Sequence, residues 1–144
     1  MKPNDFIHRL DHDKIAASIA AAEARTSGEI RVMVTHKAAP EPVTRAEQAF
    51  VRLGMADTAE RNGVLIFVAP ASQTFAVIGD HGVHRECGPA FWTELAAAMT
   101  GDFKAGDHTA AIIKGITRAG DLLATRFPRR ADDKNELSNQ VVTD

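Results

Sequence analysis

The stretch RNGVLIFVAPASQTFAVIGDHG, residues 61–82, predicts two neighbouring strands of one sheet. Its first half, GVLIFVAP, is apolar without alternation, which is typical of a strand covered by helices on both faces. Only residues 70–73 separate this run from TFAVIG, and so short a connection allows only an antiparallel hairpin. The end of the second strand should therefore lie beside the start of the first.

Regular periodicities surround this hairpin. Residues 29–35 alternate as a half-covered strand does. Apolar residues at helical spacing predict four helices, over residues 11–25, 44–53, 89–99 and 107–126. The second helix is expected to begin with a capping box at Thr44 and Glu47, and the last has Asp107 as its N-cap. A helix between the first two strands makes them parallel. We therefore expect an α/β fold, a three-layer α/β/α sandwich around a small mixed sheet with one β-hairpin.

The length and composition fit one domain. The chain has 144 residues, of which 44% are hydrophobic and 25% charged, as in ordinary globular proteins. We expect a single α/β domain over residues 1–127 and a polar C-terminal tail over residues 128–144. Within that tail, Leu137 and Val141 are the residues expected to dock on the domain.

Charge, hydropathy and cysteine content indicate where the protein works. The net charge of -2, with scattered Lys and Arg, argues against nucleic-acid binding. No apolar run approaches the ~20 residues that span a bilayer, and residues 1–10 do not resemble a signal peptide. Cys87 is the only cysteine, so no intramolecular disulfide can form. We expect a cytoplasmic protein without a membrane span.

Four motifs in order resemble one known family. TSGEIRVMV, RNGVLIFVAP, FAVIGDHGVH and FKAGDHTAAIIKGI are together similar to the TPM domain, over about residues 11–127. That domain is named for a thylakoid lumen protein, a photosystem repair protein and a nematode receptor modulator. The ending NELSNQV, residues 135–141, resembles that of the short, membrane-free bacterial members.

The resemblance implies a twisted sheet between helices and divalent-cation binding in some members. It also implies an acid phosphatase activity, which has been claimed for a plant member. Many membrane-bound relatives have an Asp before the Asn-Gly that begins the second strand, and this sequence has Arg61 there. A site that needs that carboxylate would lose a ligand here.

The predicted hairpin brings the GDHG loop, residues 79–82, close to Arg61 and Asn62. Hard cations such as Ca²⁺ and Mg²⁺ take carboxylate and carbonyl oxygens as ligands. Five residues are the predicted metal ligands: Asp80, Asn62, Glu29, Glu60 and Asp57. The spacing matches no EF-hand. In the alternative interpretation Asp80 caps its own loop by an Asx turn and Glu29 is solvated.

Two other chemistries use the same loop. A phosphatase would employ Asp80 as nucleophile or metal ligand, His81 as acid and Arg61 on the phosphate, although the D-x-D-x-[TV] and C-x5-R motifs are absent. A transition-metal site would use His81, His84 and Glu86 as ligands. His108 would be its fourth ligand. Cys87 is interpreted as a small apolar filler.

The sequence thus predicts a TPM-domain protein that binds Ca²⁺ or Mg²⁺ as a binding or regulatory module. A metal-dependent acid phosphatase using the Asp80 loop is the alternative. A third possibility is an interaction protein whose polar tail recruits an unknown protein partner.

Overall fold

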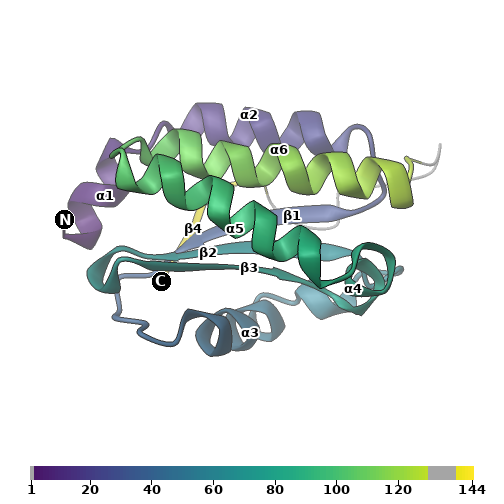
Figure 1. Cartoon of the computed structure of the whole chain (residues 1–144), viewed down its shortest axis with the longest axis horizontal. Helices are drawn as coiled ribbons and strands as arrows, with labels where there is room; N and C mark the ends of the chain where they lie inside the picture. Colours follow the sequence, from purple (N-terminus) through teal and green to yellow (C-terminus); the bar gives the residue numbers. More distant parts are fainter. Residues whose placement is uncertain (1, 130–138) are drawn as a thin grey trace.

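The computed structural model describes residues 2–129 and 139–144 (Figure 1). The helices are α1 (Pro3–Arg9), α2 (His12–Glu23), α3 (Pro42–Arg52), α4 (His81–Cys87), α5 (Pro89–Lys104) and α6 (His108–Arg126). The strands are β1 (Glu29–Val34), β2 (Gly63–Ala69), β3 (Thr74–Gly79) and β4 (Val142–Thr143). Short 3-10 turns cover Met55–Asp57 and Pro70–Ser72. Within these residues, no helix is both long and apolar enough to cross a membrane.

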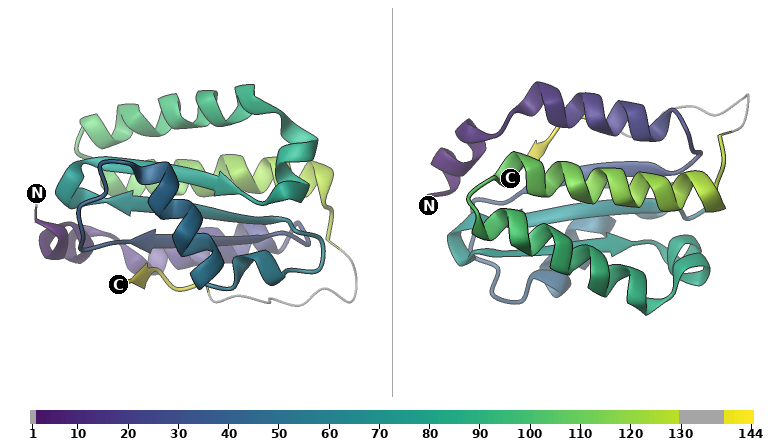
Figure 2. Two further views of the ribbon diagram at one scale, coloured as in Figure 1. Left: turned by 90° about the horizontal axis from the view of Figure 1, so that it is seen from below. Right: turned by 45° about the horizontal axis from the view of Figure 1, so that its top comes forward.

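One mixed sheet with the strand order β3-β2-β1-β4 forms the centre of the fold. β1 and β2 are parallel, with Glu29 opposite Gly63, and the helix α3 connects them. β2 and β3 are antiparallel, with Val64 opposite Gly79. The predicted hairpin and the predicted parallel pair are therefore confirmed (Figure 2).

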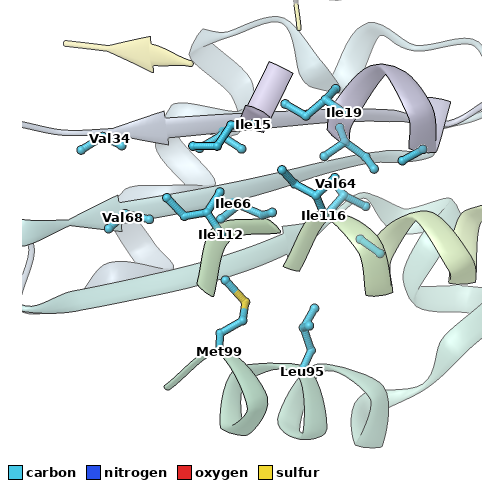
Figure 3. Close-up of a cluster of buried hydrophobic side chains, with 14 of the residues drawn as sticks. Ile15, Ile19, Val34, Val64, Ile66, Val68, Leu95, Met99, Ile112 and Ile116 are labelled. Atoms are coloured by element: carbon cyan, nitrogen blue, oxygen red, sulfur yellow. The ribbon is translucent and has the colours of Figure 1, made fainter. Parts of the chain in front are cut away.

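Helices cover both faces of the sheet, as the apolar run in β2 predicts. α3 lies on one face, and α2, α5 and α6 lie on the other (Figure 1). Val64, Ile66 and Val68 of β2 belong to the larger core beneath α2, α5 and α6, where they meet side chains from those helices: Ile15, Ile19, Met99, Ile112 and Ile116 (Figure 3). Leu65 and Phe67 belong to the core beneath α3. Both faces of β2 are buried, so the three-layer sandwich is confirmed.

Two helix starts differ from the sequence prediction. α1, Pro3–Arg9, was not predicted, because seven residues with a single buried side chain, Phe6, show little periodicity. The capping box at Thr44 and Glu47 is wrong, since α3 already begins at Pro42 and Glu41 makes no side-chain cap. The fixed φ of proline suits the first turn of a helix.

Two helices after β3 differ from the sequence prediction, and the third agrees with it. Residues 81–87, expected to be part of a loop, form α4 with Asp80 as N-cap. α5 continues to Lys104 instead of ending at residue 99, because Gly101 inside a helix costs only about 1 kcal/mol and no proline stops the helix there. α6 begins after its predicted N-cap, Asp107.

The end of the chain joins the sheet, which the sequence did not predict. Val142 and Thr143 pair in parallel with Met33 and Val34. The carboxylate of Asp144 then accepts hydrogen bonds from the Thr35 hydroxyl at 2.6 Å and the His36 N–H at 2.9 Å. Val141 packs against the larger core, as expected. Leu137 lies outside the described residues. A two-residue strand is too short to show a periodicity.

Candidate functional site at the Asp80 end of the sheet

Arg61 and Asp80 form a two-point ion pair at one end of the hairpin. Arg61 precedes β2 and Asp80 follows β3, so the antiparallel pairing brings them together. Arg61 Nε donates to Asp80 Oδ2 at 2.8 Å, and Arg61 Nη2 donates to Oδ1 at 3.0 Å. The Asp80 side chain is 4% exposed and that of Arg61 is 48% exposed. The predicted proximity of the two residues is confirmed.

The carboxylates near Arg61 stabilise its positive charge. The hydrogen bonds and the charge of Asp80 raise the pKa of Arg61 above its ordinary value, and the charge of Asp57 adds to that effect. Asp57 is exposed in the 3-10 turn that precedes Arg61. Two predicted carboxylates, one buried and one exposed, therefore act on the same guanidinium.

Backbone contacts fix the position of Asp80. Its N–H donates to the Gly63 carbonyl at 2.9 Å, and its Oδ1 accepts from the His81 N–H at 2.7 Å, which caps α4. The Gly82 N–H donates to the Arg61 carbonyl at 2.9 Å. A Cβ at Gly82 would lie 2.6 Å from the Glu60 carbonyl oxygen, so only glycine fits there. α4 is thus packed directly on the residues that enter β2.

Asn62 and Glu60 belong to a hydrogen-bond network with Ser27. Asn62 is 1% exposed, and its Nδ2 donates to Ser27 Oγ and to Glu60 Oε2, each at 3.2 Å. Ser27 Oγ donates to Glu60 Oε2 at 2.8 Å. The structure therefore places these two predicted ligands beside each other, in contacts that hold the turn before β1 against the turn before β2.

Glu29 lies beside a carboxylate that sequence reasoning missed, that of Glu23. Both residues are buried, and Glu23 Oε2 accepts from the Ile30 N–H at 2.8 Å. Burial raises the pKa of Glu23 to about 8, and the hydrogen bond with Glu29 and the charge of Glu29 add to this rise. β2 separates Glu29 from β3, a backbone distance of roughly 10 Å at the usual strand spacing. The one signal for Glu23 was its position four residues after buried Ile19 on the same helix.

The histidine residues and Cys87 do not form a metal site at this end of the sheet within the described residues. Within residues 2–129 and 139–144, no three His, Cys, Asp or Glu side chains gather as a metal-holding group. His81, His84 and Glu86 are exposed on α4. His108 contacts Phe6 at the opposite end of the sheet, so it is not the fourth ligand of a site on α4. Burial raises the pKa of Cys87, which keeps it a thiol in contact with the larger core.

An open hollow of about 500 Å³ adjoins the Glu60 side of this end. Two exposed guanidinium groups, those of Arg85 and Arg126, line it together with Glu60. Arg85 belongs to α4 and Arg126 is the last residue of α6. Such a pair of cations is suited to binding an anion.

Comparisons with known proteins agree with the fold. Residues 1–122 match the model of the TPM domain family. The NMR structure of BA42 protein from the psychrophilic bacterium Bizionia argentinensis is 36% identical, covers 92% of each chain and has a TM-score of 0.85. The N-terminal domain of a protein from P. gingivalis, 12% identical with a TM-score of 0.57 over 79% of this chain and 75% of its own, shares the fold alone. No curated protein matches. The chain belongs to the TPM domain family.

Proposed function

We propose that the protein is a binding module whose Asp80 end takes up Ca²⁺ or Mg²⁺ in exchange for the guanidinium of Arg61. One observation carries the proposal: a buried carboxylate, held in place by the backbone, has a half-exposed cation of the same chain as its partner. The guanidinium lies on the solvent side of the pair, so a divalent ion that displaces it would reach the Asp80 carboxylate without rearrangement of the buried side.

The ligand set suits a weak site for a hard cation. Asp80 and Asp57 would supply the carboxylates, with Asn62 and the backbone carbonyls near Glu60 as neutral oxygens. Mg²⁺ typically keeps several waters and needs only one or two carboxylates, and Ca²⁺ accepts backbone oxygens readily. A site of this charge is expected to bind in the millimolar range.

Exchange at Asp80 would be transmitted to α4. Asp80 caps this helix, and the Gly82 N–H holds it on the Arg61 carbonyl. When the guanidinium leaves, it becomes available at the surface beside α4. The proposed output is therefore a changed surface around Arg61 and α4, which is what a regulatory module requires.

Titration with CaCl₂ and MgCl₂, followed by amide NMR, tests this function. We expect saturable shifts in residues 57–63 and 79–86 at millimolar metal, and their loss in Asp80→Asn. Asp121→Asn is the matched control, because Asp121 pairs with Arg25 in an exposed Arg–Asp contact elsewhere. No shift in these residues with either metal, or equal shifts in Asp80→Asn, would contradict the proposal.

A phosphomonoesterase is the alternative, and the hollow beside Arg85 and Arg126 is the observation that favours it. Asp80 would be nucleophile or metal ligand, His81 the acid and Arg61 a phosphate contact. Against this, Arg61 and the His81 N–H already hydrogen-bond the Asp80 carboxylate. Hydrolysis of p-nitrophenyl phosphate by the purified protein tests it: Asp80→Asn should abolish the rate, and Arg85→Gln should raise KM. A rate unchanged in Asp80→Asn would mark a contaminant.

Two further predictions concern the surroundings of the protein. We propose a cytoplasmic location because the chain holds a single cysteine, and cell fractionation tests it.

Recruitment of a protein partner by the tail is a separate proposal. Its test replaces residues 130–138 by a Gly/Ser linker and keeps β4, since Val142 and Thr143 belong to the sheet. Loss of a pull-down partner would support recruitment.

A further inference from the structure

A cavity of about 450 Å³ lies at the end of the sheet opposite to Asp80. It opens where the β2–β3 hairpin, α1 and the turn between α5 and α6 meet, at the left of Figure 1. Ligand sites in open α/β sheets favour the carboxyl ends of the strands, and the last two residues of β2, Val68 and Ala69, line this cavity. The volume lies within the range of small-molecule sites.

Aromatic rings form the walls of the cavity. The ring centroids of Phe75 and Phe103 are 5.0 Å apart, and those of Phe6 and His108 are 4.7 Å apart. Phe103 also faces His108, at 6.1 Å. Burial and the nearby charge of Arg9 lower the pKa of His108, so this ring is neutral at pH 7. Three phenylalanine rings and the neutral imidazole of His108 therefore wall the cavity.

Lys104 places a positive charge beside these rings. It lines the cavity and is exposed, and within the described part of the chain it forms no ion pair. The neighbouring acidic groups are engaged elsewhere: Asp102 pairs with Lys114 at 2.8 Å, and Asp107 accepts the Ala110 N–H at 3.1 Å. The cavity thus combines mainly apolar walls with the positive charge of Lys104 at its edge.

We propose that this cavity binds a small amphiphilic carboxylate, whose apolar body lies among Phe6, Phe75 and Phe103 and whose carboxylate pairs with Lys104. Burial of the apolar body supplies most of the affinity, and the ion pair selects the anionic head. The inference goes beyond the proposed cation site and is independent of it, because the two sites lie at opposite ends of β2.

Amide NMR titration with 2-naphthoate, and with uncharged 2-naphthamide as its matched analogue, tests this site. We expect saturable naphthoate shifts in residues 68–75 and 100–108, with weaker binding of the amide. Lys104→Gln should weaken naphthoate by about two- to fivefold and leave the amide unchanged. Lys14→Gln, an exposed lysine on α2, is the control and should change neither affinity.

A second variant tests the location. Thr100 lines the cavity, so Thr100→Phe should fill it and abolish the naphthoate shifts. An amide spectrum with native dispersion shows that this variant folds; if it does not fold, the Lys104→Gln comparison decides. Absence of saturable shifts in the wild-type cavity, equal affinity for naphthoate and naphthamide, or full naphthoate binding in folded Thr100→Phe would each overturn the proposal.

Discussion

The guanidinium of Arg61 covers the carboxylate of Asp80 through two hydrogen bonds, at 2.8 and 3.0 Å. Asp80 is almost completely buried, and Arg61 is half exposed. The cation of this end thus belongs to the chain itself and lies on the side open to solvent. It follows that the proposed uptake of a divalent ion is an exchange of one cation for another.

Substitution of Arg61 is expected to strengthen metal binding. Arg61 has a φ of 52°, a conformation that Asn and Asp adopt more readily than other residues with side chains. Arg61→Asn removes the competing charge and should raise the Ca²⁺ affinity by roughly fivefold, and Arg61→Asp, which adds a carboxylate, should raise it further. Calorimetric titration measures both, with Arg25→Asn as the control. Affinities equal to or below that of the wild type would contradict exchange.

Gly82→Ala should destabilise the fold. Its Cβ would lie 2.6 Å from the Glu60 carbonyl oxygen and 2.7 Å from that of Arg61, and the backbone cannot move away easily. We expect a loss of about 2 kcal/mol in the free energy of unfolding, measured by urea denaturation. Gly101→Ala, in the last turn of α5, is the control, because nothing lies within 4 Å of its Cβ, and it should stabilise by about 0.5 kcal/mol. Equal effects of the two substitutions would show that α4 is not packed on this turn.

Glu23 is expected to make stability depend on pH. Its pKa is raised by burial and by Glu29 from 4.5 to about 8, while Arg129 opposes the rise. Between these values the folded protein binds a proton that the unfolded chain releases. The contribution of Glu23 is therefore complete below pH 4.5 and is lost as the pH rises through about 8.

Glu23→Gln tests this dependence. The amide oxygen can still accept the Ile30 N–H, and no charge needs to be buried above pH 4.5. We expect the variant to gain stability over the wild type as the pH rises, on the order of 2 kcal/mol at pH 8. Denaturation at several pH values measures the difference, and Glu47→Gln on the exposed face of α3 is the control. A difference that is constant from pH 4 to 9 would refute the raised pKa.

Asn62→Ala should cost more than Ser27→Ala. Asn62 is buried, and its side chain donates to both Ser27 Oγ and Glu60 Oε2, so Asn62→Ala removes both hydrogen bonds. Ser27→Ala leaves the contact between Asn62 and Glu60 in place. We expect about 1–3 kcal/mol for Asn62→Ala and less for Ser27→Ala, measured by denaturation. The opposite order would mean that Asn62 is not the centre of this network.

The hairpin was predictable because local rules determine it. The unbroken apolar run of β2 and the four-residue connection at 70–73 allow one pairing, and that pairing brings Arg61 to Asp80. Contacts between residues far apart in the sequence were harder to predict. The two-residue strand β4 depends on pairing with Met33 and Val34, more than a hundred residues earlier. Its sequence shows no period of its own.

The sequence predicted which segments of the site lie close together better than it predicted which side chains contact one another. Topology places Asp80 near Arg61, but it does not reveal that the carboxylate also caps α4. Glu29 is predicted either as a ligand beside Asp80 or as a solvated residue, whereas the structure buries it beside Glu23 of α2. A helix residue that covers the edge of a strand cannot be identified from the periodicity of that strand.

The Arg61 Nε–H resonance provides the most direct test of the exchange. During titration with CaCl₂, we predict that it moves from a hydrogen-bonded position towards that of a free guanidinium, in proportion to the amide shifts of residues 79–86. Asp80→Ala, which leaves no side-chain acceptor, should show the free position without metal. An Arg61 Nε–H signal that stays unchanged at millimolar Ca²⁺, whether or not the amides shift, would contradict the account.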